Sequence, residues 1–551
     1  MGESDSYYNP NQQQPYSNGG YQQQYQPQPP PATHQQYQPP PPQPQPYQQG
    51  PPQNGNGYMP AQGYNGNEKG SFEEQFKIPK PKYNDLWAGI LLICVFIGFV
   101  VVSAISLQGY AANRGNAGSG IYNNPNNFSL NTSTIILFMF VLVVAFVLSY
   151  AYVWLARLFP KQFIWVTGIL NVCWALGTAI FYLWRRYWSA GIVFLIFGLF
   201  MAFCFWTWIS RIPFSALMLR TTIDVSKKYG HVYLTSFIGG LIATAFSAWF
   251  AVTLVAIYVK YQPSQNNPSC ADGGCGQGKV IGLIVFITFA MYWFSEWLKN
   301  TIHTTIAGVY GSWYFNPHNF PKDATRASAK RALTYSFGSI SLGSLLVAIV
   351  QFLRQLCNAA RNQEAADGSI VGYALFCCIS CLLGLLEWAV EFLNRYAFCH
   401  IALYGKAYFP AAKDTWKMIK DRGIDALINV SYSNMSVRDV ANQSQDCLIG
   451  PVLSFGALFI AYACALLGYL YLFFTDPAYN NEGQFTPVVV AFSFLIGFQI
   501  ANVFTTPISS GVDTIFVAAG WDPQVMWRDH PELYNEMIRV YPKVQQVIRD
   551  R

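Results

Sequence analysis

The sequence predicts an all-α polytopic membrane protein of about ten transmembrane helices, and two observations support this fold class. The first is composition: the 551 residues are 52% hydrophobic and only 11% charged, whereas a soluble globular protein carries roughly 25% charged residues. The second is a series of long apolar runs that begins at Leu86. A helix needs about 20 apolar residues to cross a bilayer, and backbone groups that cross lipid must bond to one another within a helix.

Ten runs are long and apolar enough to be transmembrane helices. They are predicted at residues 86–108, 134–156, 163–184, 188–210, 232–259, 280–302, 334–356, 370–391, 448–474 and 486–509. These runs divide the chain into an N-terminal tail (1–82), a ten-span domain (83–510) and a C-terminal tail (511–551).

The N-terminal tail has a composition of its own. Residues 1–70 are mainly Gln, Pro, Tyr, Gly and Asn, and the phrase QQYQP occurs at 23–27 and again at 35–39. Such a segment has too little apolar surface to offset the entropy of ordering, so it is predicted to be disordered and partly polyproline II. The protein partners of this tail are unknown from sequence.

The charges in the loops predict that both termini are cytosolic. Lys and Arg concentrate in cytoplasmic loops of membrane proteins. The loops after even-numbered runs hold 17 Lys and Arg residues, and the loops after odd-numbered runs hold 7 when Arg354, at the end of the seventh run, is counted with them. The loops of the first group are therefore expected in the cytosol, together with both tails.

Two features of the predicted outer loops agree with this orientation. The first outer loop contains Asn127-Phe-Ser and Asn131-Thr-Ser, which are acceptor sequences for N-glycosylation. The third contains Cys270 and Cys275, and a disulfide is predicted there because the outer space is oxidising. The other ten cysteines lie in the runs or near their ends, and we interpret them as packing residues. No metal site is predicted.

Residues 292–315, YWFSEWLKNTIHTTIAGVYGSWYF, introduce polar groups directly after an apolar run. At 3.6 residues per turn, Trp293, Glu296, Trp297 and Asn300 share one broad helical face. A charge at such depth costs about 2–3 kcal/mol on the mildest scales, so it normally faces a cavity or a partner.

Two interpretations of Glu296 remain open. Its helical face lines a solute path, or Glu296 is a structural carboxylate at the cytosolic edge of the bundle that pairs with Lys299 or Lys406. A second cluster, LLGLLEWAVEFLNRYAF, places Glu387 beside Trp388. Carboxylates and aromatic rings are the groups that hold a quaternary ammonium ion, but they are also ordinary residues of helix ends at the membrane interface.

At these stretches the sequence resembles the choline transporter-like family, and within it the fungal pH-nine-sensitive branch. The resemblance spans about residues 85–546 and is carried by 292–315 and by EFLNRYAFCHIALYGKAYFPAAKDTW (391–416), RGIDALIN (422–429) and GVDTIFVAAGWDP (511–523). It implies ten spans with both ends cytosolic, a location in the plasma membrane, and transport, with choline as the family's named substrate. The first outer loop, 110–133, is shorter than that of animal members.

Two classes of function follow. The first is a plasma-membrane transporter or facilitator of a small organic solute, choline or a choline-like cation, with predicted substrate-binding residues Trp293, Glu296, Trp297, Asn300, Glu387 and Trp388. The alternative is a non-transporting membrane scaffold or stress-tolerance protein that acts through its cytosolic tail and loops. The sequence contains no strong catalytic motif, so we predict no enzyme and no cofactor. The expected partners are the lipid bilayer and the solute, and no nucleic acid.

Overall fold

The computed structural model describes residues 82–113, 132–209, 212–261, 276–318, 320–422, 449–475 and 486–540. The regular secondary structure of these residues is helical throughout, which confirms the predicted all-α fold class. Several predictions fall outside the described residues: the N-terminal tail apart from Lys82, the glycosylation sites Asn127 and Asn131, and the cysteine pair Cys270 and Cys275.

Ten long helices coincide with the ten predicted runs. They are α2 (Leu86–Asn113), α3 (Thr132–Leu158), α4 (Pro160–Trp184), α5 (Trp188–Trp208), α7 (His231–Tyr261), α8 (Gln277–Phe315), α10 (Phe337–Ala366), α11 (Ile370–Tyr404), α15 (Ile449–Thr475) and α16 (Thr486–Trp521). Among the described residues, nine of these helices are long and apolar enough to cross a membrane. In α5 the apolar stretch is shorter, Gly191–Phe203.

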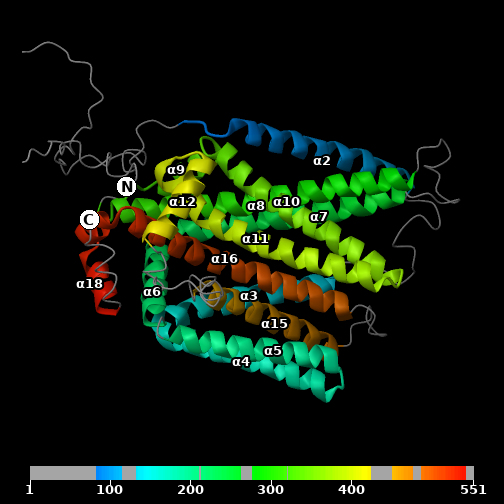
Figure 1. Cartoon of the computed structure of the whole chain (residues 1–551), viewed down its shortest axis with the longest axis horizontal. Coiled ribbons are helices and arrows are strands. Elements are labelled where there is room, and N and C mark those ends of the chain that lie inside the picture. Colours follow the sequence, from blue (N-terminus) through cyan, green and yellow to red (C-terminus); the bar gives the residue numbers. More distant parts are fainter. Residues whose placement is uncertain are drawn as a thin grey trace, which may run out of the picture. The chain divides into compact units, whose positions relative to one another are not determined.

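The long helices run side by side along a common direction (Figure 1). The described chain begins at α2 and finishes at α18 at the same end of this bundle, on the left in Figure 1, which we name the terminal end. Further short helices lie at the terminal end: α6 (Ile212–Lys228), α9 (Ala324–Leu333), α12 (Tyr408–Arg422), α17 (Pro523–Asp529) and α18 (Pro531–Val540).

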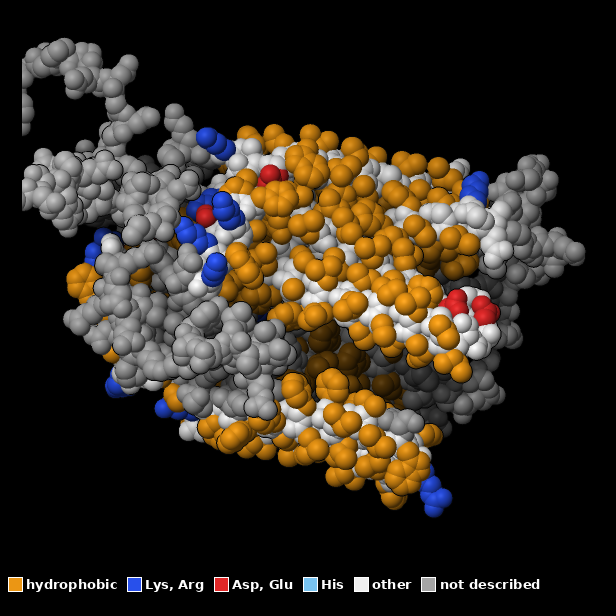
Figure 2. Space-filling model, viewed as in Figure 1, with side chains coloured by type: hydrophobic (Ala, Val, Ile, Leu, Met, Phe, Trp, Pro, Cys, Tyr) orange, Lys and Arg blue, Asp and Glu red, His pale blue; other side chains and the backbone are white. Residues whose placement is uncertain are grey.

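The flanks of the long helices are apolar. Figure 2 shows hydrophobic side chains over their length, with Lys and Arg near the two ends of the bundle. Large side chains on these flanks are open to the surroundings: Trp206 is 70% exposed and Trp174 is 67% exposed. Apolar surface of this extent is unfavourable in water but matches the hydrocarbon interior of a bilayer. The chain is therefore a multi-pass membrane protein.

Helix α8 occupies the centre of the bundle. It packs against α2, α7, α10, α11 and α16. Its 39 residues span roughly 58 Å at 1.5 Å per residue, nearly twice the ~30 Å thickness of the hydrocarbon layer. The part beyond the predicted run 280–302 is almost entirely buried in protein at the terminal end.

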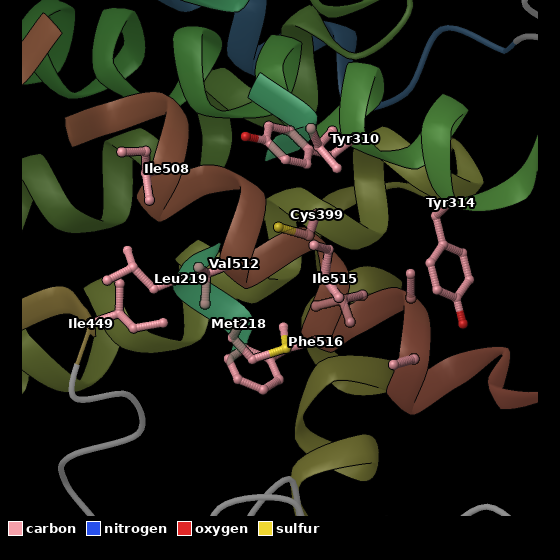
Figure 3. Packing of buried hydrophobic residues seen from close by; sticks show 14 of the residues in the cluster. Met218, Leu219, Tyr310, Tyr314, Cys399, Ile449, Ile508, Val512, Ile515 and Phe516 are labelled. Carbon is pink, nitrogen blue, oxygen red and sulfur yellow. The ribbon is translucent and has the colours of Figure 1, made fainter. Parts of the chain in front are cut away.

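The C-terminal boundary differs from the predicted one at residues 510 and 511. Helix α16 continues to Trp521, and α17 and α18 pack against the ends of α16, α8 and α6, so the predicted tail begins inside a helix. Val512, Ile515 and Phe516 are buried in a core that includes residues of α6 and α8 (Figure 3). The apolar pattern continues past 510 because protein, rather than lipid, covers this part of α16.

Close packing fixes α16 against α8 in this core. Tyr310 of α8 makes two contacts. Its hydroxyl donates a hydrogen bond to the Thr222 carbonyl oxygen of α6 at 3.0 Å, and its ring lies against Gly511 of α16. A Cβ atom at position 511 would overlap that ring. Glycine at this position therefore allows α8 and α16 to approach each other closely.

Candidate functional site

A cavity of about 920 Å³ lies among α7, α8, α11, α15 and α16, and we name it the central cavity. Five of the side chains that line it are charged: Glu296, Lys299, Glu391, Arg395 and Asp513. Three carboxylates and two basic groups give this lining a formal charge of −1. The cavity is therefore polar and mildly acidic, although it lies within helices whose outer flanks are apolar.

Helix α8 contributes one polar stripe to the cavity. Lys299 and Asn300 lie three and four residues after Glu296, and His303 lies four and three residues after them, so all four project from one side of the helix. The Lys299 Nζ lies 3.2 Å from a Glu296 oxygen and 3.0 Å from an oxygen of Glu391 on α11. Glu296 therefore has features of both interpretations. It pairs with Lys299, as expected of a structural carboxylate, and it also lines the cavity.

Helices α11 and α16 contribute a second ion pair. The Arg395 Nε lies 3.5 Å from the Asp513 Oδ2, and the side chain of Asp513 is only 5% exposed. His303 bridges the same two helices, because its Nδ1 lies 2.9 Å from the Ser510 Oγ and its Nε2 lies 2.9 Å from the Arg395 carbonyl oxygen. The three helices are therefore joined by polar contacts at this end of the cavity.

Two asparagines in the lining anchor the cavity to α10. The Asn300 amide donates to the Ser344 hydroxyl at 2.9 Å, and the Asn394 amide donates to the Gly343 carbonyl oxygen at 2.9 Å. The Tyr408 hydroxyl of α12 donates to the Asn394 Oδ1 at 2.5 Å. These bonds satisfy the buried amides, as buried polar groups require, and they hold α8 and α11 in position.

Aromatic rings supply the remaining character of the cavity. Trp388, Phe392 and Phe498 line it. The Trp388 and Phe392 rings are stacked with their centroids 5.8 Å apart. Ring faces next to carboxylates attract organic cations through the quadrupole of the ring and the opposite charge of the acid. The cavity therefore combines the groups that suit a small cationic solute.

The six predicted substrate-binding residues divide into two sets. Glu296, Asn300 and Trp388 line the central cavity, whereas Trp293, Trp297 and Glu387 are not among its lining residues.

The second set has structural contacts instead. Trp293 is 1% exposed, and its Nε1 donates to the Ser341 carbonyl oxygen of α10 at 3.0 Å. Trp297 packs against Phe337 at the start of α10. The Glu387 Oε2 lies 2.6 Å from Arg354 Nη1, in an ion pair between α10 and α11.

The sequence-based interpretation did not include Asp513 in the site. Asp513 was omitted because the predicted domain boundary at residue 510 assigned it to the C-terminal tail. A signal was present, because Asp513 is the one charged residue within GVDTIFVAAGW (511–521), and a lone acid in an apolar helix normally faces a cavity or a partner.

Comparison with known proteins agrees with this architecture. Residues 192–524 match the family model described as plasma-membrane choline transporter. The chain is 85% identical to Protein PNS1 of Gibberella zeae over 563 aligned positions, which cover all of both chains. It is 60% identical to Protein PNS1 of Neurospora crassa, over 87% of this chain and 84% of that protein. The identity to Protein PNS1 of Saccharomyces cerevisiae is 41%, over 86% of this chain and 87% of the yeast protein. The chain therefore belongs to the choline transporter-like family, a family of membrane transporters.

Proposed function

We propose that the protein moves a small organic cation, choline or a choline-like quaternary ammonium ion, across the plasma membrane and binds it in the central cavity. The observation that carries this proposal is the cavity itself, with its volume of about 920 Å³ and its charged lining. Pockets for small organic ligands typically measure about 300–1,000 Å³. Choline in the name of the matching family supports the same class of solute.

The charges of the lining favour a cation. A carboxylate within a membrane helix normally pairs with another polar group or lines a solute pathway. This cavity has three carboxylates, at Glu296, Glu391 and Asp513. Lys299 and Arg395 balance two of the three negative charges. The remaining formal charge of −1 gives an entering cation a net attraction.

The direction of the chain in the membrane is part of the proposal. The described helices α6, α9 and α12 at the terminal end are rich in Lys and Arg, so we propose that this end faces the cytosol. Ser236 and Gly450 line the cavity from within the first two turns of α7 and α15, which both begin at the terminal end. The binding site would therefore lie in the cytosolic half of the membrane.

Uptake of labelled choline into vesicles that contain the purified full-length protein tests the proposal. The key variant is Gly240→Leu, because Gly240 lines the cavity and the nearest atom to an added Cβ, on Val503, is 3.5 Å away. The larger side chain should fit and fill part of the cavity. Gly177→Leu on α4 is the matched control, since no atom lies within 4 Å of an added Cβ there.

We expect choline uptake by the wild-type protein and by Gly177→Leu, and a loss of most uptake in Gly240→Leu. If well-folded wild-type protein takes up neither choline nor other quaternary ammonium ions, the proposal is wrong, and the scaffold function becomes the better explanation. Equal uptake by the two variants would show that transport does not pass through the central cavity.

A further inference from the structure

The guanidinium group of Arg395 lies where an organic cation would find its preferred surroundings. Its Cζ atom is 5.1 Å from the centroid of the Tyr396 ring and 5.9 Å from that of Phe392. Its Nε is 3.5 Å from the Asp513 Oδ2. Two aromatic rings and one carboxylate thus surround a positive charge that belongs to the protein itself.

The contact between Arg395 and Asp513 differs from the other ion pair of the central cavity. Lys299 donates hydrogen bonds to Glu296 and Glu391 at 3.2 and 3.0 Å. The Asp513 Oδ2 is buried and accepts no hydrogen bond from any group that the structure describes. It meets Arg395 through charge at 3.5 Å, which is longer than a charge-assisted hydrogen bond of about 2.7–2.9 Å.

A quaternary ammonium ion can replace Arg395 as the positive charge next to Asp513. Such an ion carries a positive charge but no N–H group, so it binds carboxylates and ring faces without hydrogen bonds. Replacing Arg395 by such an ion therefore breaks no hydrogen bond that the structure describes at Asp513 Oδ2. It does break the hydrogen bond that Arg395 Nη2 donates to the Tyr396 hydroxyl at 3.5 Å.

We infer that Arg395 is a tethered counter-ion that occupies a cation subsite formed by the cavity-lining residues Asp513 and Phe392, and that an organic cation binds there by displacing it. This inference rests on the proposed function and names the place and the competitor within the same cavity. The side chain of Arg395 is 36% exposed, which leaves it room to move. Glu391 lies one helical turn away on α11 at i−4, within reach of the displaced guanidinium.

The tethered counter-ion also explains how an acidic group persists so deep in the protein. A buried carboxylate without a partner costs several kcal/mol, and Asp513 would pay that penalty in an empty cavity. Arg395 supplies the compensating charge when no solute is bound. The solute supplies it when bound, so the charge of Asp513 stays compensated in both states.

Binding of tetramethylammonium to the purified full-length protein in lipid nanodiscs, measured by titration calorimetry, tests this inference. Arg395→Gln removes the competitor and should bind tetramethylammonium more tightly than the wild type by roughly tenfold, the size of a cation contact with ring and carboxylate. Arg395→Lys keeps a competing charge and should stay nearer to the wild type. Arg354→Gln is the matched control, because the Arg354–Glu387 pair lies on α10 and α11 outside the cavity lining; it should bind as the wild type does.

Asp513→Asn provides a second, opposite test and should weaken binding by roughly tenfold. Where Arg395→Gln proves unstable, the rise in melting temperature on adding tetramethylammonium serves as the measurement, since a ligand stabilises the state that binds it. That rise should be larger in Arg395→Gln than in the wild type.

The inference is overturned by wild-type affinity in Asp513→Asn, or by equal or weaker binding in Arg395→Gln. In either case a wild-type protein that still binds tetramethylammonium leaves the proposed function intact. If neither the wild type nor Arg395→Gln binds it, the proposed solute class fails together with the subsite.

Discussion

Replacing Glu296 by Gln tests whether the charge of the central cavity selects a cation. Glutamine keeps the size of the side chain and an acceptor oxygen for Lys299 and Gln351, which both donate to Glu296 in the native protein. The substitution changes the formal charge of the lining from −1 to 0. The fold should persist, because the Lys299 ion pair with Glu391 remains.

The size of the effect follows from the dimensions of the cavity. A sphere of 920 Å³ has a radius of about 6 Å, so a cation at its centre lies about 6 Å from a charge on its wall. Coulomb's law gives such a pair about 0.7 kcal/mol in bulk water and about 2.8 kcal/mol at an effective dielectric constant of about 20. Glu296→Gln should therefore weaken cation binding by about 1–3 kcal/mol, or roughly 5- to 150-fold.

The assay is the initial rate of labelled choline uptake into vesicles as a function of choline concentration. We expect the half-saturating concentration to rise in Glu296→Gln. Glu387→Gln makes the same chemical change at an ion pair outside the cavity lining, and it should behave nearly as the wild type. An unchanged half-saturating concentration in Glu296→Gln would refute the reasoning, as would an equal rise in both variants.

Three further predictions concern stability and topology. Gly511→Ala should lower the melting temperature through overpacking worth about 1–3 kcal/mol, because its Cβ would overlap a buried ring; the control Gly177→Ala, in open space, should leave the melting temperature unchanged or slightly raised. Burial lowers the pKa of His530 in the folded protein below the value of about 6.5 that histidine has in the unfolded chain. The stability that the neutral, buried His530 provides is therefore present above about pH 6.5 and is lost as the pH falls through the lower pKa of the folded state. Melting temperatures at pH 7.5 and 5.5 should therefore differ more in the wild type than in His530→Gln, and an equal difference would contradict the role of this group. Finally, glycan should be found on Asn127 or Asn131, and enzymatic removal followed by a shift in electrophoretic mobility checks this; glycan on the loop 423–447 would reverse the proposed orientation.

The places of the long helices are readable from the sequence because lipid acts on each helix separately. A run of about 20 apolar residues is stable in the hydrocarbon layer whatever its neighbours are. Helices α2 and α15 accordingly lie where the runs 86–108 and 448–474 predicted them. The ends of α8 and α16 were predicted too early, because at the terminal end their residues are buried by other helices, and an apolar pattern does not distinguish protein from lipid.

The division of the predicted helical face depended on packing. With about 100° per residue, Glu296 and Asn300 lie about 40° apart, and Trp293 and Trp297 lie about 20–60° farther round from Asn300. The period therefore groups all four residues within a broad face. Only the neighbours of α8 divide it: α10 covers the two tryptophans, and the central cavity lies beside Glu296 and Asn300.

A helical membrane protein with acids and rings in two of its spans is readable from the sequence alone, since both properties are local to single helices. Which charges meet depends instead on how the helices pack together. Lys299 and Glu391 are 92 residues apart in the chain, and Arg395 and Asp513 belong to α11 and α16. Pairing across such separations depends on how the helices pack, and that is fixed by close contacts such as Tyr310 against Gly511. Such contacts leave no periodic signal in the sequence, because each depends on the shapes of two distant segments together.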